Sequence, residues 1–131
     1  MNGAQSLIGT LVQSHVDVCF TNPGTSEMHF VAALDGSEMR AVLTLFEGVA
    51  TGAADGYARI SGEVGVCCSS VGPGAANMIM GIATAYFTSS PILAISGGII
   101  TKQAGRGQLQ ETSRAETPTD QGYMQALQPF T

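Results

Sequence analysis

Residues 45–59 read Leu45-Phe46-Glu47-Gly48-Val49-Ala50-Thr51-Gly52-Ala53-Ala54-Asp55-Gly56-Tyr57-Ala58-Arg59. Glu47 stands where an apolar strand, residues 41–46, gives way to a helix of small residues, 48–60. A carboxylate at the end of a buried strand is costly to remove from water, so it must be paired, protonated or functional. Two interpretations stay open on these residues alone. Glu47 either takes part in chemistry or stabilises its own helix through the helix dipole.

The composition indicates a single compact α/β domain over residues 1–131. Charged residues make up only 11% of the chain and hydrophobic residues 44%, and the 17 glycines suit close packing of helices on strands. The net charge is −5 and the five Lys and Arg are placed singly, so no basic face for nucleic acid is expected. The low charge suggests that a second subunit or domain covers part of the surface.

The cysteines and histidines predict neither a disulfide framework nor a metal site. Cys19, Cys67 and Cys68 lie in apolar runs, which is typical of core thiols in a reducing compartment. Cys67 and Cys68 should point to opposite faces of one strand, and His15 and His29 have no ligand spacing around them. There is no leader-like N-terminus and no run of about 18 apolar residues, so we expect a soluble, cytoplasmic chain without a membrane span.

Helices and strands alternate along the sequence. Helices are expected over residues 4–14, 25–34, 48–60 and 75–88, and strands over 16–20, 40–46, 64–68 and 92–96. Short, continuously apolar strands indicate a mostly parallel sheet with helices on both faces, a three-layer α/β/α fold. The helix at 75–88 is small or apolar all round, which predicts deep burial. Residues 101–119 are expected to form a loop and 119–127 a short helix, and we expect the last strand of the sheet to be missing.

Three loops follow the carboxyl ends of successive strands. They are Asn22-Pro23-Gly24-Thr25, Phe46-Glu47-Gly48 and the stretch from Ser69 to Gly74. The carboxyl ends of parallel strands meet at one edge of an open sheet, and ligands bind there. The three loops together therefore predict one binding site that contains Glu47.

The glycine loop Gly72-Pro73-Gly74-Ala75-Ala76-Asn77 follows a strand and opens a helix, as a G-x-G-x-x-G dinucleotide fingerprint does. Asn77 replaces the third glycine, and no acid for a ribose stands about 20 residues on, so NAD binding is not expected. No Lys and no Walker sequence supports a phosphate cradle. Two interpretations remain, a close approach of the backbone to a flat ligand or a tight strand-to-helix turn.

Several segments together resemble the pyrimidine-binding (PYR) domain of thiamine diphosphate-dependent enzymes. The resemblance is closest to the acetolactate synthase large subunit and to benzoylformate and other 2-oxo acid decarboxylases. In family order, the matching segments are 20–24 (FTNPG), Glu47 with 53–59 (AADGYAR), 72–77 (GPGAAN), 81–86 (GIATAY) and 91–97 (PILAISG). The resemblance runs from about residue 3 to 113 and implies a PYR-like fold.

For the site, the resemblance implies that Glu47 is the catalytic acid. In the family this glutamate hydrogen-bonds a ring nitrogen of the cofactor's aminopyrimidine and promotes its imino tautomer. The resemblance also implies cofactor-binding roles for Asn22, Pro23, Gly24, Thr25, Gly72, Pro73, Gly74 and Asn77. Candidates for contact with the substrate are Thr25, Ser69 and Gln110.

The sequence departs from the family pattern at two places near the site. Phe46-Glu47-Gly48 stands where acetolactate synthases usually carry His-Glu-Gln, and Cys68-Ser69-Ser70 stands where some decarboxylases place a His. The 2-oxo acid substrate, and the choice between carboligation and decarboxylation, therefore stay open.

The family's PP-domain pattern, Gly-Asp-Gly followed by Asn-Asn, is not found in these 131 residues. The resemblance implies that a separate PP domain, in cis or in trans, holds the diphosphate through Mg²⁺ and is needed for activity. It also implies a homodimer or higher homo-oligomer packed along the small-residue helix at residues 48–56. The alternative is an isolated PYR-fold scaffold or oligomerisation domain without catalysis of its own.

Overall fold

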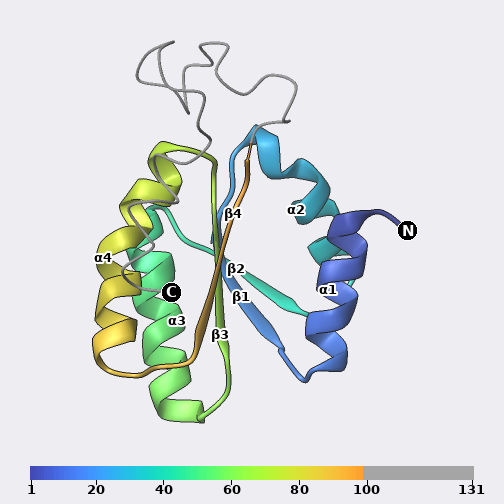
Figure 1. Ribbon diagram of the computed structural model, residues 1–131. Helices are drawn as coiled ribbons and strands as arrows, with labels where there is room; N and C mark the ends of the chain where they lie inside the picture. The colour runs from blue at the N-terminus through green and yellow to red at the C-terminus, as the bar shows by residue number, and fades with distance from the viewer. Residues whose placement is uncertain (99–131) are drawn as a thin grey trace.

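The computed structural model describes residues 1–98 and shows a sheet between two pairs of helices (Figure 1). The elements in chain order are α1 (Gly3–Gln13), β1 (Val18–Asn22), the 3₁₀ helix η1 (Thr25–Glu27), α2 (Met28–Asp35), β2 (Arg40–Leu43), α3 (Glu47–Ser61), β3 (Gly65–Ser69), α4 (Pro73–Phe87) and β4 (Ile92–Ser96). The loop expected at 101–119 and the helix at 119–127 lie outside the described residues, as does any strand after β4.

The described sheet has four parallel strands in the order β2-β1-β3-β4. Helices α1 and α2 cover one face, and α3 and α4 cover the other (Figure 1). The predicted three-layer α/β/α architecture with a parallel sheet is therefore confirmed. The last residues of the two central strands, Asn22 of β1 and Ser69 of β3, are register partners, so the loops after β1 and β3 leave the sheet side by side. No helix of the described part is long and apolar enough to cross a membrane.

Neighbouring residues of β3 pack into two different hydrophobic cores, one on each face of the sheet. Cys67 packs with Ala54 and Met78 under α3 and α4, whereas Cys68 packs with Phe30 under α1 and α2. The predicted opposite orientation of the two thiols is confirmed. Burial raises the pKa of both thiols to about 12, so they stay protonated and act as small apolar core groups.

Helix α3 lies unusually close to its neighbours because glycine faces it at two points. A Cβ on Gly81 of α4 would collide with the fully buried side chain of Thr51, and a Cβ on Gly65 of β3 would collide with the carbonyl oxygen of Ala54. Neither residue could be larger without moving α3 outward. Gly65 and Gly81 therefore determine how close to the sheet and to α4 the helix lies, and Glu47 is the first residue of that helix.

Two sequence predictions need correction. Strand β2 ends at Leu43 and not at residue 46, because β2 is the edge strand and its pairing with β1 stops at Thr21 and Leu43. Helix α4 is not buried all round within the described structure. Its outer face leaves Met80 82% and Phe87 78% exposed, which sequence composition cannot distinguish from a buried face.

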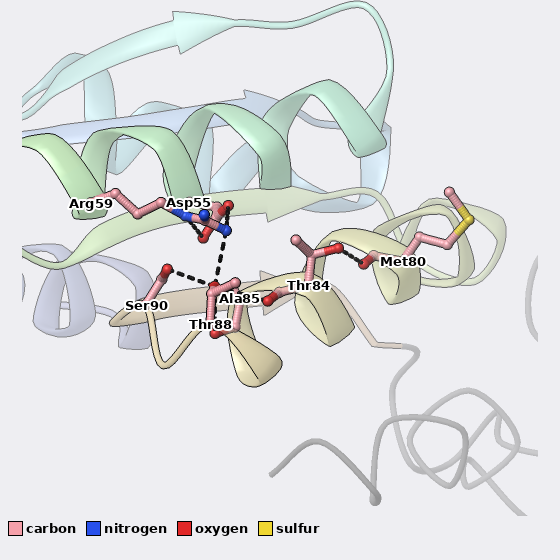
Figure 2. Close-up of polar contacts among 7 residues, drawn as sticks. All are labelled: Asp55, Arg59, Met80, Thr84, Ala85, Thr88 and Ser90. Carbon is pink, nitrogen blue, oxygen red and sulfur yellow. Dashed lines mark hydrogen bonds and ion pairs between the residues drawn. The ribbon is translucent and has the colours of Figure 1, made fainter.

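The C-terminal half of α3 is tied to the end of α4 by polar contacts (Figure 2). Arg59 Nη2 lies 2.7 Å from Asp55 Oδ2 and also donates to Thr88 Oγ1 at 2.9 Å. Hydrogen bonds from Arg59 and Ser90 hold the pKa of Asp55 below its usual range. Asp55 and Arg59, the two charged residues of segment 53–59, therefore hold α3 against the end of α4.

Asp55→Asn should lower the free energy of unfolding at neutral pH by about 1 kcal/mol or less, because the Arg59 side chain is 43% exposed. The folded-state pKa of Asp55 is lowered, so its contribution is present above the unfolded pKa of about 4 and is lost as the pH falls through the folded-state value. Urea unfolding of both proteins should show a difference at neutral pH that shrinks in acid. An equal difference at both pH values would contradict this assignment.

Candidate functional site

Glu47 is the first residue of α3 and is 7% exposed. The preceding Phe46 has extended backbone, so the chain turns directly into the helix at the acid. This position places the carboxylate against the positive end of the helix dipole. The geometry therefore fits the helix-stabilising interpretation, and any functional interpretation depends on what surrounds the carboxylate.

Both carboxylate oxygens of Glu47 accept a hydrogen bond from an asparagine amide. Asn22 Nδ2, at the end of β1, donates to Oε1 at 3.0 Å, and Asn77 Nδ2, on α4, donates to Oε2 at 2.9 Å. The buried acid is thus paired, and by donors from two different elements. The family resemblance predicted a cofactor-binding role for both asparagines, and nothing in the sequence indicated that they hold Glu47. No spacing rule links residues 22, 47 and 77.

Glycine keeps the backbone of α4 close to Glu47. A Cβ on Gly74 would lie 3.1 Å from Glu47 Oε1 and 2.6 Å from Ser70 Oγ. Gly72, just before the helix, has a φ of 69°, in the region that favours glycine. The glycine loop therefore makes the sharp turn that one interpretation of its sequence expects, and it also brings backbone against the acid.

A second buried carboxyl lies at the same edge of the sheet. Glu27 is 5% exposed, and its Oε2 accepts a hydrogen bond from the Gly24 N–H at 2.9 Å. Its Oε1 has no hydrogen-bond partner among residues 1–98, and a Cβ on Gly97 would collide with it. Glu27 was not among the site residues predicted from the sequence. The only signal was its place three residues after Gly24, which is the spacing of a capping box.

The other predicted site residues are spread along this edge. Thr25 and Pro73 are exposed. Pro23 lines a separate cavity of about 400 Å³ between α2 and β2. Ser69 is fully buried, and its hydroxyl donates to the carbonyl of Ser70 at 3.1 Å. Gln110 lies outside the described residues.

Phe46 and Gly48, the two residues beside Glu47 that depart from the family pattern, are sterically linked. A Cβ on Gly48 would collide with the ring of Phe46, which folds back over the start of α3. The ring is half exposed. A large residue at position 46 in this orientation therefore requires glycine at position 48.

An apolar groove of about 570 Å³ separates α3 and α4 on their outer side. It begins beside Phe46 and Asn77 and extends to Thr84. Val49, 56% exposed, and Met80, 82% exposed, lie along it. The groove thus starts at a residue that holds Glu47.

Asn77→Ala should cost about 1–2 kcal/mol of unfolding free energy, because it leaves one oxygen of a buried carboxylate unpaired. Thr84→Ala, at another exposed position of α4, is the matched control and should change stability by about 0.5 kcal/mol or less. Urea unfolding measures both. Equal effects of the two substitutions would mean that the Asn77–Glu47 hydrogen bond contributes nothing.

Comparison with known proteins identifies related sequences. Residues 1–117 match the family described as thiamine pyrophosphate enzyme, N-terminal TPP binding domain. A Mycobacterium tuberculosis protein described as an acetolactate synthase large subunit, IlvX, is 58% identical over 98 residues, 74% of this chain and 19% of the relative.

Two further relatives extend the match. A Methanocaldococcus jannaschii protein described as an acetolactate synthase large subunit is 46% identical over 111 residues, 85% of this chain and 19% of its own length. The chloroplastic acetolactate synthase 2 of Brassica napus is 39% identical over 127 residues, 94% of this chain and 20% of its own length. The chain thus spans about a fifth of the length of these relatives.

Proposed function

Since this chain belongs to the thiamine pyrophosphate enzyme family, matching its N-terminal TPP binding domain, we propose that it forms the pyrimidine-binding half of a 2-oxo acid carboligase or decarboxylase of the acetolactate synthase type. The observation that carries the proposal is the carboxylate of Glu47. It is buried at the carboxyl edge of a parallel sheet, and two amides fix it in place. Such edges are where open α/β sheets bind ligands.

The residues around Glu47 suit an aminopyrimidine ring. A carboxyl group can hydrogen-bond a ring nitrogen, and Gly74, which has no side chain, lets the backbone of α4 lie directly against Oε1. Thiamine diphosphate, when bound, supplies the carbon nucleophile and the electron sink. We propose that a PP domain, in cis or in trans, holds its diphosphate and Mg²⁺.

In this proposal the chain holds Glu47 in a fixed position while a proton is shared with the aminopyrimidine ring. The amide groups of Asn22 and Asn77 fix both oxygens before any ligand arrives, so little reorganisation is needed on binding. Glu47 is 7% exposed, so little water reaches its carboxylate. Position and a defined proton partner are what an acid–base group requires.

Glu47→Gln should abolish product formation from pyruvate in the assembly completed with a PP domain, Mg²⁺ and thiamine diphosphate, because an amide cannot share the proton. Folding should be nearly unchanged, since the side-chain amides of Asn22 and Asn77 can rotate to offer a carbonyl to the new NH₂ group. Glu38→Gln, which changes an exposed carboxyl, serves as control.

The assay is acetolactate or acetaldehyde formation, with circular dichroism as the check on folding. Undiminished turnover by Glu47→Gln would refute the role of this acid. Turnover by the unmodified chain without any PP domain would instead refute the need for a partner and the alternative of a non-catalytic scaffold.

The groove between α3 and α4 supports a second function, self-association. We propose that two copies pack these faces together, as a dimer or within a higher homo-oligomer. Exposed Val49 and Met80 supply apolar area, and Gly52 lets the partner's backbone come near. The same face would serve a catalytic assembly and a non-catalytic scaffold.

Met80→Glu should shift the chain toward monomer, because it places a charge in the apolar contact. Met28→Glu adds the same charge at an exposed methionine on α2, on the other face of the sheet, and should leave association unchanged. Sedimentation velocity over a range of concentrations distinguishes the two. A monomeric unmodified chain at every concentration would rule out self-association.

We also propose a reducing, cytoplasmic location. The three cysteines are free and buried, as is usual for proteins of a reducing compartment, where disulfides are rare. They are Cys19, Cys67 and Cys68.

A further inference from the structure

The cavity of about 400 Å³ between α2 and β2 lies apart from Glu47. Thr21 of β1 and Leu43 of β2 both line it, and they are register partners, so their side chains point to the same face of the sheet. That face is the one covered by α1 and α2, whereas α3, which begins at Glu47, covers the other face (Figure 1). We refer to this cavity as the α2–β2 cavity.

Most of the lining of the α2–β2 cavity is apolar. Leu34 and Met39, each 4% exposed, form its buried wall. Val31 and Ala41 line its more open part. Leu43 belongs to the lining as well and is 68% exposed, since β2 is the edge strand of the described sheet. A ligand that covers these side chains would remove apolar surface from water.

One polar side chain of the lining is free to meet a ligand. Ser37 Oγ already donates to the Leu34 carbonyl at 2.9 Å and accepts from the Met39 N–H at 3.2 Å. The Thr21 hydroxyl is enclosed by protein, so it is out of reach from the cavity. The carboxylate of Asp35 is exposed and forms no hydrogen bond or ion pair within residues 1–98. Polar recognition in this cavity therefore depends on Asp35.

The charges at this end of α2 favour a cation. Asp35 is the last residue of α2, where the helix dipole leaves partial negative charge, and no base stands in the last turn. No Lys, Arg or His is among the described residues that line the cavity. Arg40 precedes Ala41 on β2, so its side chain points to the opposite face of the sheet. A positive group would thus be attracted to Asp35, and an anion would be repelled.

We propose that the α2–β2 cavity binds a small apolar molecule that carries one cationic nitrogen. The apolar part lies against Leu34, Met39 and Leu43, and the nitrogen pairs with the carboxylate of Asp35. The ligand is a free compound and not a segment of a protein partner, because the volume is that of a small-molecule pocket. The inference does not depend on the proposed function, since Glu47 lies on the other side of the sheet.

Three probes of matched shape test the proposal on the full 131-residue chain. They are the hexylammonium ion, 1-hexanol and hexanoate, and each is titrated while amide chemical shifts are followed by NMR. Asp35→Asn removes the carboxylate at an exposed position. Glu38→Gln is the matched control. Asp35 borders both this cavity and a neighbouring cleft between α1 and α2, whereas Glu38 borders that cleft and not this cavity.

Hexylammonium should bind about threefold more tightly than 1-hexanol, which is the gain from one exposed ion pair, and hexanoate should bind most weakly. The shifts should centre on Val31, Ala41 and Leu43. Asp35→Asn should reduce the affinity for hexylammonium to that for 1-hexanol, and Glu38→Gln should leave the preference unchanged. Added salt should weaken the preference, because Asp35 is exposed.

Equal affinities of the unmodified chain for hexylammonium and 1-hexanol would overturn the proposal, as would a preference that survives in Asp35→Asn. Shifts centred on Gly9 and Ala32 would place the probe in the cleft between α1 and α2 and would also overturn it. The peptide acetyl-Leu-Lys-Leu-amide serves as a fourth probe. If it binds at the α2–β2 cavity more tightly than hexylammonium, the occupant is a protein partner and the small-molecule assignment is wrong.

Discussion

The hydrogen bonds that hold the Glu47 carboxylate are the constraint on which the site depends. A buried carboxylate is tolerated only when its oxygens find donors, and here those donors are single amides of Asn22 and Asn77. One amide stands on β1 and the other on α4, so the strand, the helix and the start of α3 must keep fixed relative positions. The parallel sheet provides this, because it brings the ends of β1 and β3, and hence the start of α4, to one edge.

Packing around α3 transmits that constraint through the domain. Thr51 against Gly81, and Ala54 against Gly65, allow α3 to pack closely on α4 and β3, and a larger residue at either glycine would push α3 outward. Farther along, Asp55 and Arg59 tie the same helix to the end of α4. Most of the segment that resembles a family motif therefore serves to place the helix, and Glu47 alone contributes the carboxyl group of the site.

The sequence predicted what local patterns control. Alternating helical and strand periodicity predicted the elements and the parallel three-layer fold. Because parallel strands end at the same edge of the sheet, it also predicted that the loops after them lie at one edge. Contacts between distant residues were missed, because no spacing rule connects Asn22 with Glu47 or reveals that Glu27 is buried. The burial of Ser69, whose hydroxyl is bonded to the Ser70 carbonyl, was likewise not evident from the sequence.

The Phe46 and Gly48 departures bear on what kind of site this is. A lost function would be expected to loosen the contacts of Glu47, yet both of its oxygens are paired. The departures instead compensate each other, since the Phe46 ring occupies the space that Gly48 leaves free. Phe46 and Gly48 both line the groove on the outer side of α3 and α4. The change therefore alters the surface of this groove and leaves the two hydrogen bonds of Glu47 intact.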